Sequence, residues 1–245
     1  MTDRTACPRV IGVVAARGGS LRFPGKNIAP ILGKPLIEYV IETALSAKLL
    51  DRVIVSTNDR EIARVAVARG AQVVPRPERL AEHDSPIDEA YRHVSAYCEE
   101  AEGIPPEIIV GMQANLPIRK PGEIDEVVRR LLDAPWATAV ATGKQVTERP
   151  EWMKILRDEA TREIKPFMNP GARYRKQDLP VLYLLDGAVV AVRDRVLRET
   201  AGNHAVHAYL GDRVILHVHE ARYSVEIDEP GDVKLAEYLL KDGRS

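Results

Sequence analysis

Short apolar runs alternate with amphipathic segments along the first two thirds of this chain, and that alternation constrains its fold most strongly. The apolar runs predict buried strands at residues 10–16, 51–59, 71–77 and 107–114. Between them, apolar residues recur at helical spacing and predict helices at 35–50, 60–70, 84–101 and 121–133. Strands joined by helices of this length form parallel sheets with right-handed crossovers. The sequence therefore predicts a doubly wound α/β fold with a mostly parallel sheet.

The pattern loosens after residue 136. Apolar stretches at 137–143 and 183–193 flank a polar, proline-bearing segment without a clean period. We expect this segment, residues 145–180, to form a hairpin or lid laid over the sheet. Residues 212–230 predict a strand, a loop and a second strand, followed by a terminal helix at 231–240. No repeat or linker marks a second domain, so residues 1–245 are predicted to form one domain.

Charge and cysteine usage argue against several functional classes. The chain has 35 basic and 36 acidic residues, which argues against the basic surface needed to bind nucleic acid. Cys7 and Cys98 lack the spacing of a metal site or a redox pair. The sequence shows neither the apolar region of a signal peptide nor a run of roughly 20 apolar residues that could span a membrane. We expect a soluble, cytoplasmic protein whose partners are small molecules.

The segment ARGGSLRFPGKN, residues 16–27, follows the first predicted strand. Ligands of open α/β sheets bind beyond the carboxyl ends of the strands, which is where this segment lies. Its glycine pair, Gly18 and Gly19, permits a tight loop whose amides face an anion. Its cations can neutralise a triphosphate: Arg17, Arg22 and Lys26. The segment is predicted to bind phosphates.

Two familiar phosphate motifs do not describe this loop. A P-loop needs four residues between its glycines and a Ser or Thr after the lysine. Here five residues separate Gly19 from Gly25, and Asn27 follows the lysine. The GxGxxG fingerprint of dinucleotide-binding proteins is absent as well.

These residues carry a resemblance to a known family. ARGGSLRFPGKN, followed by GKPLIEYVIETA, resembles the opening motif of the acylneuraminate cytidylyltransferases (CMP-sialic acid synthetases) and is similar to that of the related CMP-Kdo synthetases. The resemblance continues in order through residues 51–88, QANLPIRKPGEID, YRKQDLP, DGAVVAVR and SVEIDEPGD. It implies a Rossmann-like, nucleotide-diphospho-sugar transferase fold and transfer of CMP from CTP to an acidic 2-keto sugar, with loss of pyrophosphate and a need for Mg²⁺. It also implies a homodimer in which residues 145–180 reach the partner's site.

The resemblance implies roles for individual residues on the nucleotide side. It places on CTP the residues Arg17, Gly18, Ser20, Arg22, Lys26 and Asn27, with the cations on the phosphates and Asn27 nearer the nucleoside. Arg76 matches an arginine that meets the cytosine region. The residues predicted to be catalytic are Arg17, Lys26, Gln113 and Asp228.

On the acceptor side, Gln113 matches a glutamine beside the sugar. The cations expected near the sugar carboxylate are Lys154, Arg175 and Lys176. For any single cation within residues 145–180, exposure to solvent on a loop is an equally good interpretation from the residues alone.

Asp228, with Glu226 two residues before it, occupies the family's paired-aspartate position for Mg²⁺. Residues two apart on a strand face the same side, so this pair could hold one hard cation with phosphate oxygens completing its shell. From the residues alone, two exposed carboxylates are the more frequent outcome, and the resemblance favours the metal. His217 and His219 are assigned no role, because two histidines without a third ligand are more often structural or exposed.

The acceptor half departs from the family's pattern. QANLPIR lacks a Thr-Ser pair, Asp186 stands where an asparagine is usual, and Lys176 stands where a second arginine is common. An aspartate offers a hydrogen-bond acceptor where the asparagine offered a donor. We therefore predict an acceptor other than ordinary N-acetylneuraminate: a related nonulosonate, or a different small acid such as a phosphonate. A nucleotide-binding module without catalysis is the alternative from another functional class.

Overall fold

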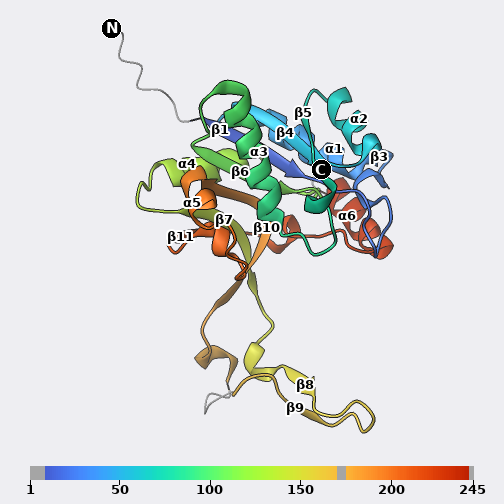
Figure 1. The fold of residues 1–245 in the computed structure, drawn as a ribbon. Helices are drawn as coiled ribbons and strands as arrows, with labels where there is room; N and C mark the ends of the chain where they lie inside the picture. Colours follow the sequence, from blue (N-terminus) through green and yellow to red (C-terminus); the bar gives the residue numbers. More distant parts are fainter. Residues whose placement is uncertain (1–8, 170–174, 243–245) are drawn as a thin grey trace.

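The computed structural model describes residues 9–169 and 175–242. Its centre is a seven-stranded sheet in the order β11-β7-β10-β6-β1-β4-β5 (Figure 1). In chain order the strands are β1 (Val10–Ala15), β4 (Arg52–Thr57), β5 (Gln72–Pro75), β6 (Ile108–Gln113), β7 (Ala139–Val146), β10 (Leu182–Arg193) and β11 (Val214–His219). Strand β10 runs antiparallel to its neighbours β6 and β7, and the other neighbouring pairs are parallel. The predicted mostly parallel, doubly wound sheet is confirmed.

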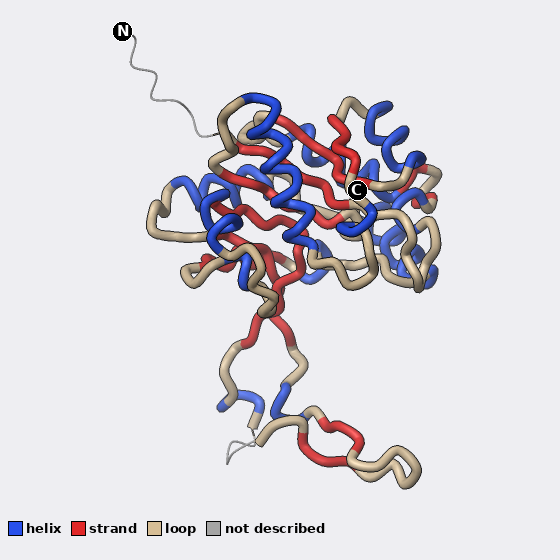
Figure 2. The backbone as a smooth tube through the Cα atoms, viewed as in Figure 1, coloured by secondary structure: helices blue, strands red, loops and turns tan. Residues whose placement is uncertain are grey.

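Helices cover both faces of the sheet (Figures 1 and 2). One face packs against α1 (Leu36–Ser46), α2 (Arg60–Ala68) and α4 (Glu123–Leu132), and the other against α3 (Ile87–Glu102) and α5 (Asp194–Glu199). Because β1 is buried on both faces, its sequence VIGVVA is a continuous apolar run rather than an alternating one. A third, smaller core lies between α6 (Pro230–Asp242) and the short pair β2 (Pro30–Ile31) and β3 (Lys34–Pro35). None of the helices described is long and apolar enough to cross a bilayer.

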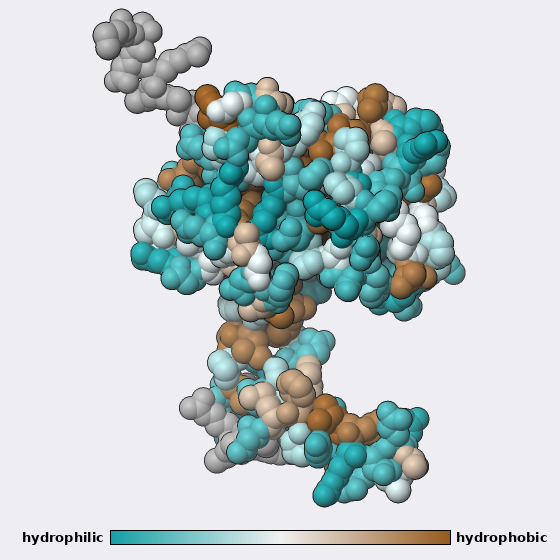
Figure 3. Space-filling model, viewed as in Figure 1, coloured by the Kyte–Doolittle hydropathy of each residue, from teal (hydrophilic) through white to brown (hydrophobic). Residues whose placement is uncertain are grey.

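Between β7 and β10 the chain leaves this body as an arm, residues 147–181. The two strands stay paired out to Val146 opposite Leu182, and the arm carries a hairpin of β8 (Lys154–Leu156) and β9 (Ile164–Pro166). The predicted hairpin is therefore present, but Figure 1 shows the arm projecting away from the sheet and not laid over it. Its apolar side chains are exposed instead of packing on the body, among them Trp152, Ile155, Ile164 and Phe167, and Figure 3 shows this apolar surface.

The second strand expected within residues 212–230 is not formed. After β11 the chain makes a short turn, η6 (Ala221–Tyr223), and residues 224–229 join no sheet. Ile227 is fully buried in the third core, and its amide donates to the carbonyl of Asn115 at 2.8 Å. The apolar pattern is therefore satisfied by anchoring this crossing segment, which carries Asp228 back to the loop after β1.

Candidate active site

The loop after β1 is braced by hydrogen bonds that need no ligand. Asn27 Nδ2 donates to the carbonyl of Arg17 at 2.9 Å and closes the loop across its base. The amide of Gly18 donates to Asn58 Oδ1 at 2.9 Å, and the Arg17 guanidinium donates to the carbonyl of Ala81 at 3.3 Å. Because Asn27 is buried in this role, the shape of the loop is preorganised.

The loop borders a cavity of about 200 Å³ at the carboxyl end of β6. Polar residues line the cavity from both sides: Arg17, Ser20, Lys26 and Asn27 from the loop, and Gln113 and Asn115 from beyond β6. A smaller hollow of about 40 Å³ adjoins it at Gly18 and Gly19. The structure thus brings together most of the residues predicted to meet CTP, together with Gln113. Asn115 is an addition that sequence reasoning missed, although it lies within the motif QANLPIR.

Asp228 faces this loop from the far end of the chain. Its Oδ1 accepts from Lys26 Nζ at 2.8 Å and its Oδ2 from Arg22 Nη2 at 2.7 Å, while Asn115 Nδ2 lies 3.4 Å from Oδ1. The hydrogen bond from Lys26, and the charges of Lys26 and Arg22, hold the pKa of Asp228 below its usual value. An anion that binds either cation therefore competes with Asp228 unless a further cation accompanies it.

Glu226 lies near Asp228, although not on the strand that was predicted. Desolvation of its carboxyl and then the negative charge of Asp228 raise the pKa of Glu226. A shared cation would relieve that repulsion. Within the described residues, no group of three or more His, Cys, Asp or Glu side chains could hold a metal. The donor set fits Mg²⁺ held by one or two carboxylates with phosphate oxygens, and not a site made by protein ligands alone.

Two buried arginines shape the edge of the sheet. Arg76 donates from Nη2 to the carbonyl of Ser56 at 2.7 Å and from Nε to its Oγ at 3.1 Å, so its side chain is held against the end of β4. Arg119, which sequence reasoning left unassigned, donates to the carbonyls of Gln113 at 2.9 Å and Ala188 at 3.1 Å. Burial lowers the pKa of each arginine to about 10, which leaves both charged at neutral pH. The predicted role of Arg76 at the cytosine stays a prediction.

The cations predicted for the acceptor are not part of this cavity. Lys154 lies on β8 and Arg175 lies just before η4 (Lys176–Asp178), and both are exposed on the arm. The arm points away from the body (Figure 1). The side chain of Lys176 lies outside what the structure describes. Within one chain, therefore, neither Lys154 nor Arg175 joins Gln113.

A buried ion cluster that sequence reasoning missed lies where β10, β11 and α4 meet. His219 Nε2 lies 2.5 Å from Asp186 Oδ2, and its Nδ1 lies 2.8 Å from Glu123 Oε1. Burial opposes the charge, but these hydrogen bonds raise the pKa of His219 to about 9. The only signal in the sequence was the pair His217 and His219, because the acidic partners of His219 lie 33 and 96 residues away.

The cluster corrects the inference drawn from Asp186. Its Oδ1 accepts from Thr142 Oγ1 at 2.7 Å and from the amide of Ala188 at 3.0 Å, and its Oδ2 faces His219. Burial opposes the shift, but these bonds lower the pKa of Asp186 to about 2. Because the carboxylate is buried and fully partnered, it is not presented to an acceptor. Asp186 in place of asparagine is therefore no argument against an N-acetylneuraminate-like acceptor.

Known proteins share this arrangement of sequence and fold. A model of the cytidylyltransferase family matches residues 11–201. The chain belongs to this family. It is 31% identical to the 3-deoxy-manno-octulosonate cytidylyltransferase of Chlamydia abortus, with 98% of this chain and 97% of that protein covered. It is 27% identical to the CMP-N,N'-diacetyllegionaminic acid synthase of Legionella pneumophila, with 95% and 97% covered.

The fold of this cytidylyltransferase is shared with a solved structure as well. A CMP:2-keto-3-deoxy-manno-octonic acid synthetase complexed with CTP matches with a TM-score of 0.70 at 19% identity, covering 96% of this chain and 99% of that one. The resemblance found in the sequence is confirmed, and the chain is a CTP-dependent nucleotidyltransferase. The alternative of a binding module without catalysis is set aside.

Proposed function

We propose that this cytidylyltransferase transfers CMP from CTP to a 2-keto sugar acid of the nonulosonate class. A hydroxyl of the sugar attacks the α-phosphorus in line, a new P–O bond forms to the sugar, the bond to pyrophosphate breaks, and the hydroxyl loses its proton. Catalysis of such transfers is mainly positioning and charge neutralisation. The names of the relatives support a sugar-acid acceptor and span octulosonate and legionaminate substrates.

The observation that carries this proposal is the cavity between the loop after β1 and Gln113. Arg17 and Lys26 border it on one side, where a triphosphate would need cations, and Gln113 and Asn115 offer amide groups on the other. Amide groups suit the hydroxyls of a sugar, because they donate and accept hydrogen bonds without charge. The cavity thus has a cationic side for a nucleotide and a neutral polar side for a sugar.

Mg²⁺ is part of the proposal, with Asp228 and Glu226 as the residues that would hold it. When bound, the ion would neutralise charge on the phosphates and polarise the phosphorus that is attacked. Asp228 would then exchange its contacts with Lys26 and Arg22, which would become free for phosphate oxygens. This exchange fits the lowered pKa of Asp228, which keeps its carboxylate ionised and able to accept a cation.

The arm is proposed to complete the acceptor site of a second copy. Its exposed apolar residues, among them Ile164 and Phe167 at 59% exposure each, have no partner surface within the described chain. Burying such residues between two copies is favourable by about 25 cal/mol per Å² of apolar surface. In such a homodimer, Lys154 and Arg175 of one copy would reach the Gln113 side of the other.

Pyrophosphate release tests the proposal. Purified protein with Mg²⁺ is given CTP or another nucleoside triphosphate, and a panel of N-acetylneuraminate, legionaminate, Kdo and small phosphonates. We expect release with CTP and a nonulosonate, and none after chelation of the metal. A phosphonate as the fastest acceptor would replace the proposed substrate class, and Kdo as the fastest would move it to the octulosonates.

A further inference from the structure

The ion cluster around His219 is tied to the acceptor side of the cavity through one turn of β10. Asp186 holds that turn by accepting from Thr142 Oγ1 and from the amide of Ala188. The pairing of β10 with β7 shifts register between Leu185 and Val190, so the regular ladder is interrupted here. The side-chain bonds of Asp186 therefore supply the restraint that the ladder lacks at this point.

The side chain of Gln113 rests directly on this turn. Gly187 has a φ of 70°, and a Cβ placed on it would lie 2.2 Å from Gln113 Nε2. No side chain other than glycine's leaves room for the amide in its present position. A shift of the turn would consequently move the Gln113 amide, whereas the loop that faces the triphosphate has its own braces in Asn27 and Asn58.

His219 supplies the charge that keeps this cluster together. Each of its ring nitrogens faces a carboxylate oxygen, so both must donate, which only the imidazolium can do. Other titratable or charged groups near the cluster come from the segments packed against it. They are Arg119, Lys120, Lys144, His217, Tyr223 and Glu226. Without the imidazolium, the buried Asp186 and Glu123 carboxylates would lose the cation between them, and Glu123 Oε2 already lacks a hydrogen-bond partner.

We propose that protonated His219 is a positioning residue for the acceptor: it clamps Asp186 and, through the turn at Gly187, fixes the amide of Gln113. The inference rests on the proposed function, because it takes Gln113 as an acceptor contact. It assigns His219 to the binding of the sugar and not to the binding of CTP. The pKa of about 9 keeps His219 charged at neutral pH.

The chain offers a matched control for His219. His217 lies two residues earlier on β11 and is also buried. Its Nε2 lies 3.8 Å from Glu123 Oε1 and 3.6 Å from Glu126 Oε2, beyond hydrogen-bond distance, and its Nδ1 has no partner. Burial lowers the pKa of His217, so it is neutral at pH 7. Replacing it removes a buried imidazole from the same strand without removing the clamp.

Steady-state kinetics of His219→Gln and His217→Gln test the inference. Glutamine can donate at only one of its two ends, so one carboxylate loses its donor. We expect the acceptor KM of His219→Gln to rise about tenfold, because a small displacement of a positioning group weakens binding on that scale. The CTP KM and kcat should stay within about twofold of the wild-type values. His217→Gln should change neither KM. Equal effects of the two variants, or an acceptor KM that does not move, would overturn the inference.

Two further readouts apply where His219→Gln fails to fold or no acceptor is turned over. In the wild type, the acceptor KM should rise as pH increases through about 9, the pKa of His219, and a flat profile would count against the clamp. The NMR resonance of the Gln113 side-chain amide should shift over the same pH range without any turnover. If the wild type releases no pyrophosphate, the proposed function fails, and a stationary Gln113 resonance would overturn the inference independently.

Discussion

The loop after β1 and the arm after β7 differ in how they hold the cations predicted to meet the two substrates. The loop is braced by the chain's own atoms, and its cations lie beside the cavity, where Lys26 and Arg22 already pair with Asp228. The arm carries Lys154 and Arg175 on exposed segments away from the cavity. The residues predicted to bind CTP are therefore assembled within one chain, whereas those predicted for the acceptor are divided between the cavity, which holds Gln113, and the arm. This difference is the basis of the proposal that a second copy completes the sugar site and is not needed for CTP.

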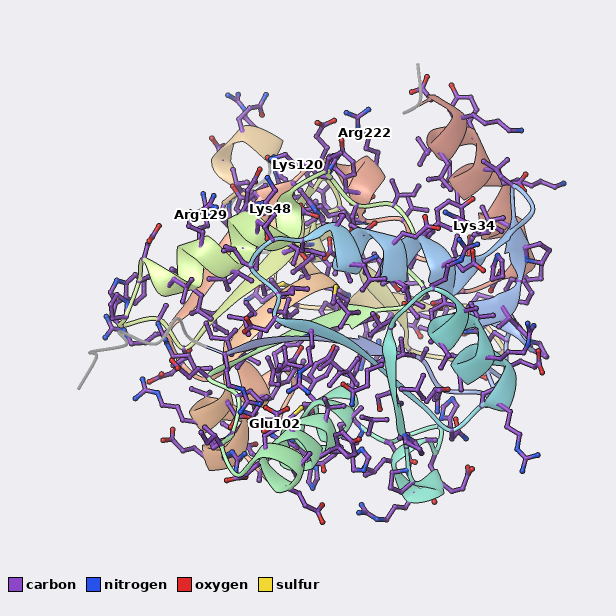
Figure 4. All side chains as sticks on the ribbon, turned by 90° about the horizontal axis from the view of Figure 1, so that it is seen from above. Lys34, Lys48, Glu102, Lys120, Arg129 and Arg222 are labelled. Carbon is purple, nitrogen blue, oxygen red and sulfur yellow. The ribbon has the colours of Figure 1, made fainter. Side chains whose placement is uncertain are left out.

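Removing a loop cation should give the largest effect. Lys26→Ala takes away a charge that lies 2.8 Å from Asp228 and borders the cavity. We expect kcat/KM for CTP to fall by about 10²–10³, the scale of losing one preorganised group that stabilises developing charge. Pyrophosphate release measures it. Lys48→Ala is the control, because Lys48 lies beside α4 (Figure 4) and its main-chain amide, not its side chain, bonds Asp125. A loss as small as that of the control would remove Lys26 from the site.

Mixing two impaired variants tests whether the arm of one copy contributes to the site of its partner. Lys154→Ala should raise the acceptor KM by roughly tenfold or more, as losing a charge-assisted contact does, and leave the CTP KM unchanged. If the arm of each copy reaches the site of its partner, a mixed dimer of Lys26→Ala and Lys154→Ala has one site with both native lysines. The other site of that dimer has neither. Refolding an equal mixture should then restore about a quarter of wild-type sites, since half of the dimers are mixed.

The control for the mixing experiment is Lys26→Ala refolded with itself. If the activity of the mixture is no greater than the mean of the two variants, each arm contributes to the site of its own chain or to no site. Sedimentation of the wild type gives the oligomeric state, and a monomer with full activity would also contradict the shared site.

The sequence predicted the nucleotide half better than the acceptor half for physical reasons. The loop residues that line the cavity lie close together in the sequence, within 16–27, so one motif names them. The cluster of His219, Asp186 and Glu123 joins residues up to 96 positions apart, so no sequence motif predicts it. The second strand failed at residues 224–229 because an alternating apolar pattern does not say whether Ile227 is buried by a ladder or by a helix.

Stability should depend on pH through His219, with an effect smaller than that of Lys26→Ala. The folded-state pKa of about 9 is raised above the ordinary 6.5, so its contribution is complete below pH 6.5 and is lost as pH rises through 9. The decline of the unfolding free energy over this window should be on the order of 2 kcal/mol. Urea unfolding of the wild type and His219→Gln measures it. A variant that declines as steeply as the wild type would assign the dependence to another group.

Two glycines, one in each half, give the smallest and most discriminating effect. Gly19 and Gly187 have φ values of 68° and 70°, so alanine at either should cost about 1 kcal/mol of stability from backbone strain. A Cβ at Gly19 meets nothing within 4 Å, whereas one at Gly187 would meet Gln113 Nε2 at 2.2 Å. With the backbone strain matched, a difference in the acceptor KM reports on Gln113. We expect Gly187→Ala alone to raise the acceptor KM, by about fivefold to tenfold, while thermal unfolding shows Gly187→Ala to be at least as destabilised as Gly19→Ala. If both variants keep the native acceptor KM, the turn at Gly187 does not position the sugar, and the acceptor half must be built elsewhere.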